Sequence, residues 1–270
     1  MQTTANLWDV LCRDLEEQRT LSPREQHRAA AGKFREAAAQ VFRANSPRLA
    51  DALEISGDVC QASGFLDDAV RDFEESLTRH RERNEPSGSA RVAAKLALLL
   101  DHQGKEHLAR EHYSQALTFF EDARDHSQHC MLLSNLAALE KRTGHLDKAL
   151  ACYAEAVELS ARIYNEVHPE VALACNNIGV AQTEARDWIA AENAHMRALG
   201  IREKLFGAMH PEVAQSLANL AVLYHSSGNL DKADSFYRAA LKTYAAFVPE
   251  SDSHVVSVRS NYKTLQASRK

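Results

Sequence analysis

The histidine-rich stretch HSQHC, residues 126–130, is the part of this 270-residue sequence best suited to chemistry. Its two histidines stand three residues apart and a cysteine follows, so on a helix two of these side chains could share a metal ion. No second cluster at matching spacing supplies the remaining ligands, and the five-residue intervals of His102, His107 and His112 spread them around a helix. We therefore expect solvated or capping histidines, and no metal site.

The 37 acidic residues offer no recognisable catalytic pair. They stand in mixed helical patterns such as RDFEESLTRHRER, residues 71–83, in which opposite charges about one turn apart pair on a solvated face. The sequence contains no glycine-rich phosphate loop, no nucleophile elbow and no HExxH motif. It therefore predicts a protein that is not an enzyme, with no cofactor and no small-molecule substrate.

Composition and charge limit the classes of partner and the cellular compartment that we expect. The formal net charge of −5 argues against binding nucleic acid, which needs a surplus of Lys and Arg. The longest nearly apolar run, VAAKLALLL at residues 92–100, is far below the ~18 residues that span a bilayer, so we expect no transmembrane segment. The five cysteines form no CxxC pair and the first residues lack a secretory signal, which predicts a reduced, cytoplasmic protein.

The elements that must position these side chains are helices in a repeating pattern. Apolar residues recur at helical spacing almost throughout, and glycine and proline are scarce, at 10 and 6 residues. The pentapeptide HPEVA occurs at residues 168–172 and again 42 positions later, at 210–214. The same interval aligns four asparagines: Asn135, Asn177, Asn219 and Asn261. An interval of 40 carries the pattern upstream through Gly64, Gly104 and Gly144.

Each repeat has the pattern of a helical hairpin. Its glycine lies between two helical segments, where a left-handed residue ends the first helix at low cost. The second segment carries a small residue and, four positions later, an aromatic one, such as Ala149 and Tyr153, so that the two helices can approach closely. Pro169 and Pro211 in HPEVA fit the first position of a helix, because a proline there loses no hydrogen bond. One hairpin cannot bury its own apolar face, so the hairpins must stack.

The spacing Gly-x-x-x-x-Ala-x-x-x-Tyr/Phe-x-x-Ala resembles the tetratricopeptide (TPR) repeat, and its 42-residue form with HPEVA resembles the repeat of kinesin light chains. This resemblance implies an all-α fold, a right-handed superhelical solenoid of about six antiparallel helical hairpins with a C-terminal capping helix. The acidic residue usual before HP in kinesin light chains is replaced by Val167 and Met209. Residues 1–45 are too short for the long heptad segment of those proteins, which favours a stand-alone repeat module.

The repeat register also predicts the boundaries within one continuous solenoid domain. A degenerate N-terminal capping hairpin is expected over residues 1–45, and the C-terminal capping helix over residues 252–270. The repeats between them are expected over residues 46–85, 86–126, 127–167, 168–209 and 210–251.

The resemblance implies that the first helix of each hairpin lines a concave groove that binds protein. It places Asn135, Asn177 and Asn219 on this groove, where their amides can bind the backbone of an extended peptide; alternatively, the asparagines bridge neighbouring helices. The same helical phase places basic residues at the centre of the groove and acidic residues at its N-terminal end. Alternatively, these charges form an ordinary solvated rim. The residues concerned are Lys95, Arg91, Lys141 and Arg142 for the centre, and Asp51, Glu54 and Asp58 for the end. A basic centre favours an acidic peptide or an acidic protein surface as partner.

These features favour a non-catalytic scaffold or adaptor that holds other proteins. The resemblance to kinesin light chains extends this hypothesis to the cytoskeleton, with tubulin-like filaments as one partner class. Two alternatives remain open: a peptide-groove receptor of the chaperone or secretion-adaptor kind, and a regulatory subunit of a separately encoded enzyme.

Overall fold

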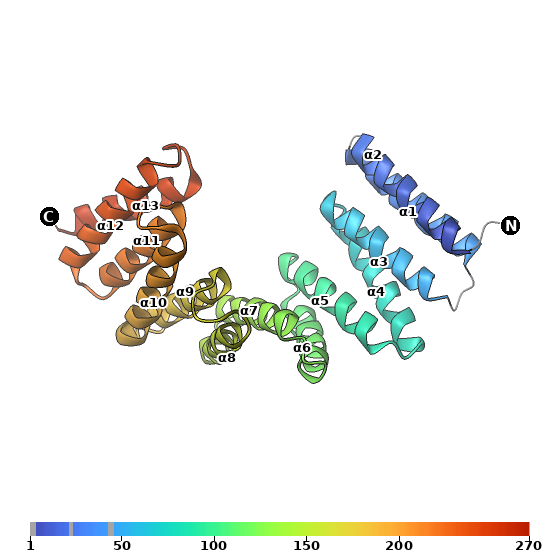
Figure 1. Ribbon diagram of the computed structural model, residues 1–270, viewed down its shortest axis with the longest axis horizontal. Coiled ribbons are helices and arrows are strands. Elements are labelled where there is room, and N and C mark those ends of the chain that lie inside the picture. The colour runs from blue at the N-terminus through green and yellow to red at the C-terminus, as the bar shows by residue number, and fades with distance from the viewer. Residues whose placement is uncertain (1–3, 22–23, 43–45, 270) are drawn as a thin grey trace. The chain divides into compact units, whose positions relative to one another are not determined.

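The protein is helical throughout the part that the structure, a computed structural model, describes: residues 4–21, 24–42 and 46–269 (Figure 1). These residues form thirteen helices and no strand, which confirms the predicted all-α repeat fold. No described helix is both long enough and apolar enough to cross a bilayer. The helices are α1 (Thr4–Leu21), α2 (Arg24–Val41), α3 (Pro47–Ala62), α4 (Leu66–Glu82), α5 (Pro86–His102), α6 (Glu106–Asp122), α7 (His126–Arg142), α8 (Leu146–Tyr164), α9 (Pro169–Glu184), α10 (Trp188–Phe206), α11 (Pro211–Ser226), α12 (Leu230–Ala245) and α13 (Ser253–Ser268).

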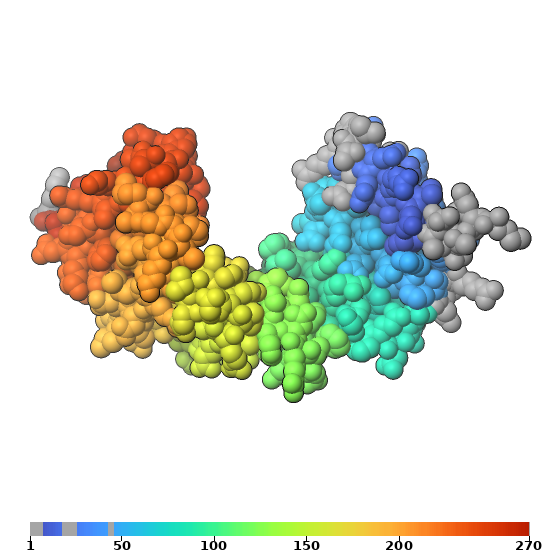
Figure 2. Space-filling model, viewed as in Figure 1, coloured from blue at the N-terminus to red at the C-terminus, as the bar shows by residue number. Residues whose placement is uncertain are grey.

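The helices form two compact units, α1 to α6 in the first and α7 to α13 in the second. Within each unit every helix packs against the next one in the chain, as expected of stacked hairpins. In the second unit α7 also contacts α9, α9 contacts α11 and α11 contacts α13, so the first helices of successive pairs lie in one layer. Figure 2 shows this stacking within the second unit, where the colours follow one another in chain order. The predicted repeat boundaries stay predictions, and each predicted repeat holds one helix pair.

Glycines in left-handed conformation end the first helix of most pairs, as the repeat pattern predicts. Gly64, Gly104, Gly144 and Gly228 have φ between 72° and 83°. The amide that follows each glycine closes the helix end, as where His145 N donates to the Glu140 carbonyl at 2.8 Å. At the one copy that has arginine in place of glycine, Arg186 adopts the same left-handed conformation with φ of 60°.

The HPEVA motif begins a helix in both of its copies, so its predicted role is confirmed. Pro169 is the first residue of α9, and His168 caps that helix, because its Nδ1 accepts from the Glu170 amide at 3.2 Å. The imidazole of His168 also stacks on Tyr164 at the end of α8, with ring centroids 4.4 Å apart. His210 repeats the same cap at the start of α11. The histidine of the motif therefore joins α8 to α9 and α10 to α11.

The core of each pair is built on the recurrent small and aromatic residues. The five alanines at the predicted helix crossings are fully buried: Ala69, Ala109, Ala149, Ala191 and Ala233. Where the facing helix has glycine, the aromatic ring lies almost on its backbone. A Cβ at Gly57 would lie 2.6 Å from the Phe73 ring, and one at Gly179 would lie 2.8 Å from His195. At these two positions only glycine leaves room for the ring.

Candidate protein-binding surface

A groove between α7 and α9 brings two of the predicted asparagines together. Asn135 and Asn177 are half-buried and line the same cavity, of about 480 Å³. Neither amide has a side-chain hydrogen-bond partner within the described part of the chain. Both therefore remain able to donate to and accept from another molecule. The lining consists of Ser127, Cys130, Met131, Ser134, Asn135, Ala138, Tyr153, Tyr164, Glu170, Leu173, Ala174 and Asn177.

Two apolar side chains of this groove were not predicted from the sequence. Met131 and Leu173 line the cavity and are 48% and 46% exposed, which is high for residues of their size. Each stands four residues before one of the groove asparagines, so a helix brings both to the same face. Their spacing of 42 residues is the signal that could have revealed them. The groove thus combines free amides with exposed apolar surface.

The third predicted asparagine follows the alternative reading and bridges two helices. Asn219 on α11 donates from Nδ2 to Asn176 Oδ1 on α9 at 2.5 Å. Asn177 has Ser134 where Asn219 has Asn176, and the shorter serine side chain donates to its own helix, to the Cys130 carbonyl. The fourth aligned asparagine, Asn261 on α13, is exposed.

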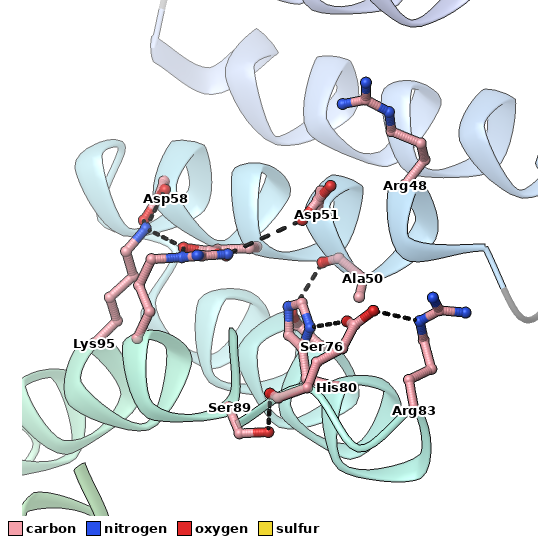
Figure 3. Close-up of polar contacts among 12 residues, drawn as sticks. Arg48, Ala50, Asp51, Asp58, Ser76, His80, Arg83, Ser89 and Lys95 are labelled. Carbon is pink, nitrogen blue, oxygen red and sulfur yellow. Dashed lines mark hydrogen bonds and ion pairs between the residues drawn. The ribbon is translucent and has the colours of Figure 1, made fainter. Parts of the chain in front are cut away.

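The basic residues predicted in the first unit are paired with the acidic ones (Figure 3). Arg91 Nη2 lies 2.7 Å from Glu54 Oε2, and Lys95 Nζ lies 2.8 Å from Glu54 Oε1 and 2.6 Å from Asp58 Oδ2. Burial alone would raise the pKa of the Glu54 carboxyl, but hydrogen bonds from Arg91 and Lys95 outweigh burial and hold that pKa below its usual value. The expected basic centre and acidic end are therefore one compensated ion-pair network here.

The other two basic residues lie in the second unit, in the last turn of α7. Lys141 Nζ is 2.8 Å from Glu184 Oε1, and Arg142 is exposed. Arg91, Lys95 and Lys141 are thus ion-paired within the protein. An acidic partner would have to replace the carboxylates of Glu54, Asp58 and Glu184 to use them, so their attraction for it is weaker than the sequence suggested.

The His129 and Cys130 side chains of the HSQHC stretch make separate contacts and do not face a common ligand position. His129 Nε2 is 3.6 Å from Glu155, and the Cys130 thiol faces the Ala156 carbonyl at 3.4 Å, so both turn towards α8. In the described parts of the chain, the group of side chains with metal-ligand spacing is instead Asp51, Glu54 and His80.

Comparison with known proteins supports the repeat pattern across most of the chain. A family model described as tetratricopeptide repeat matches residues 48–122, 128–204 and 176–246. BtubC (BKLC) from P. vanneervenii is 26% identical, with 91% of this chain and 92% of that chain covered and a TM-score of 0.66. A Podosopora anserina protein named as a kinesin light chain, with nearly identical TPR-like repeats, is 14% identical over 76% of this chain and 99% of its own, with a TM-score of 0.64. Apo RapI is 16% identical over 99% of this chain and 77% of its own, with a TM-score of 0.78. No curated protein sequence matches the chain.

Proposed function

Because this chain belongs to the tetratricopeptide repeat family, with repeats of the kinesin-light-chain-like type, we propose that it is a non-catalytic adaptor that holds a partner protein in the α7–α9 groove. Repeats of this family form scaffolds for protein–protein interaction. The observation that carries the proposal is the pair of half-buried amides without partners, Asn135 and Asn177, next to the exposed Met131 and Leu173.

An extended segment of the partner suits this groove. A peptide backbone offers both donors and acceptors, which the two amides match, and apolar side chains of the segment would cover Met131 and Leu173. Glu170 is the charged residue of the lining, so this groove itself does not favour an acidic segment. An acidic partner surface would instead have to draw cations such as Lys141 out of their ion pairs.

The groove can be tested by replacing its amides. The double variant Asn135→Ala/Asn177→Ala should lose about 2 kcal/mol of binding free energy, at about 1 kcal/mol for each hydrogen bond, or roughly thirtyfold in affinity for a partner captured by the parent protein. Asn193→Ala is the matched control, because Asn193 is an exposed asparagine on α10. If the double variant bound the partner as tightly as the parent does, the groove would not be the binding site.

The resemblance of the repeats to those of kinesin light chains favours a tubulin-like filament as the partner. Co-sedimentation with polymerised filaments at micromolar concentration tests this choice. The protein should pellet with the filaments, and less of it should pellet as salt concentration rises, because exposed charges are screened. If the protein stayed in the supernatant at all salt concentrations, tubulin-like filaments would not be its partner.

A further inference from the structure

His80 is buried near the end of α4 and is held in one orientation. Only 2% of its surface is exposed, and its Nδ1 lies 2.8 Å from Glu85 Oε2. Gly88 on α5 leaves room for the ring, since a Cβ at this glycine would overlap Nδ1 of His80. A carboxylate can only accept a hydrogen bond, so Nδ1 carries the hydrogen and Nε2 of the neutral ring presents a lone pair.

The remaining ring nitrogen of His80 is available to a ligand. Nε2 is buried and lacks a hydrogen-bond partner among the described residues. One carboxylate oxygen of Asp51, one of Glu54 and one ring nitrogen of His80 lie within 4.8 Å of one another in the first unit. Figure 3 shows Asp51 and His80. Since Glu85 takes Nδ1, Nε2 is the nitrogen left for a ligand. A buried nitrogen without a partner is costly, and a cation would remove that cost.

We propose that Asp51, Glu54 and His80 form a binding site for a divalent cation of the zinc type. One imidazole nitrogen and two carboxylate oxygens, with water in the open position, form a ligand set that zinc accepts. Bonds of about 2.1 Å in a tetrahedron bring ligand atoms to about 3.4 Å from one another. The three atoms, now within 4.8 Å, need to close by about 1.4 Å at most, which side-chain rotation supplies. Glu85 is the outer partner that fixes the imidazole.

Arg91 and Lys95 both compete with the cation for Glu54, and Arg91 also lies near Asp51. The Arg91 guanidinium donates to both oxygens of Glu54 at 2.7 to 3.1 Å, and Nη2 is 4.0 Å from Asp51 Oδ1. A bound cation draws on the same two carboxylates and repels the guanidinium, so one excludes the other from part of the site. Removing the charge of Arg91 should therefore tighten cation binding, whereas removing a ligand should weaken it.

Titration of the full chain with Zn²⁺, followed by calorimetry, tests the site, and Co²⁺ absorption reports on its ligands. The parent should bind one zinc ion per chain at this site. His80→Gln and Asp51→Asn should each weaken binding by at least about tenfold, because a ligand contributes no less than an outer partner does. Arg91→Gln should bind zinc several-fold more tightly than the parent. His102→Gln is the matched control, since His102 is an exposed histidine, and it should bind as the parent does.

The proposal stays testable if the His80 variant fails to fold. Asp51 is only partly buried, and burial raises the pKa of its carboxyl, so the fold already disfavours its charge and should accept a neutral asparagine. A parent that binds no zinc would overturn the proposal. So would an Asp51→Asn variant that binds zinc as the parent does, while loss of binding in His102→Gln would assign the zinc to surface histidines.

Discussion

Buried His195 makes the protein sensitive to mild acid. It is 1% exposed, and burial lowers its pKa to about 4, against about 6.5 in an unfolded chain. Between these two pH values the unfolded state binds a proton that the folded state does not bind. The free energy of unfolding therefore rises with pH across this window, and the protein loses stability as the pH falls below about 6.5.

The size of this effect follows from the pKa difference. At pH 5 the medium is about 1.5 units below the pKa of the unfolded histidine and still above that of the folded one. Each unit is worth about 1.36 kcal/mol, so His195 should cost the fold about 2 kcal/mol at pH 5 relative to pH 7.5.

The substitution His195→Phe should abolish this cost. Phenylalanine fits the position, because Phe73 stands at the equivalent place in an earlier repeat and lies over Gly57 as His195 lies over Gly179. Phenylalanine does not titrate, so between pH 7.5 and 5 the variant should lose about 2 kcal/mol less than the parent.

Urea unfolding followed by circular dichroism at the two pH values measures this difference. Other titrating groups are common to both proteins and cancel when the two pH-dependent losses are subtracted. His107→Gln, at an exposed histidine, controls for removing any imidazole. If the parent and His195→Phe lost the same free energy between pH 7.5 and 5, the reasoning from the buried neutral imidazole would be refuted.

Four further substitutions test the helix turns, crossings and caps by the same unfolding measurement. Arg186→Gly should raise the free energy of unfolding by about 1 kcal/mol, because arginine holds a left-handed conformation that glycine adopts without strain; a loss of stability would contradict this. Ala149→Leu and Ala191→Leu should each overpack a fully buried crossing and cost about 1–3 kcal/mol, and neutral variants would show that the repeat register is wrong. His168→Ala should cost about 1 kcal/mol through the lost cap of α9, with faster hydrogen exchange in the first turn of that helix; unchanged exchange there would argue against the cap.

The repeat fold could be predicted because its signals are local. Glycine turns such as that at Gly144, a proline at the start of a helix and a buried alanine such as Ala149 each act within one hairpin. Their recurrence at about the same interval then fixes the stacking, because neighbouring hairpins are neighbours in space. The role of His168 was missed, since a histidine cap depends on the ring orientation that stacking on Tyr164 provides.

The candidate site was harder to predict because it depends on contacts between repeats. Helical phase treats each helix alone, so it assigned Arg91 to a basic centre and Glu54 to an acidic N-terminal end, although they pair across α3 and α5. The aligned asparagines differ in their side-chain hydrogen bonds for the same reason. Asn219 reaches Asn176 on the neighbouring helix, whereas Asn177 finds only a serine at the corresponding position and stays unpaired.

The identical pentapeptide at the start of α9 and α11 makes the length of the protein open to evolutionary change. A deletion of residues 168–209 joins Val167 to the second HPEVA copy and leaves the junction letter for letter the same. Such a deletion removes one whole pair of helices, α9 and α10, and a second copy of residues 168–209 would add one. The stack can in this way become longer or shorter in steps of 42 residues while the sequence at the junction stays the same.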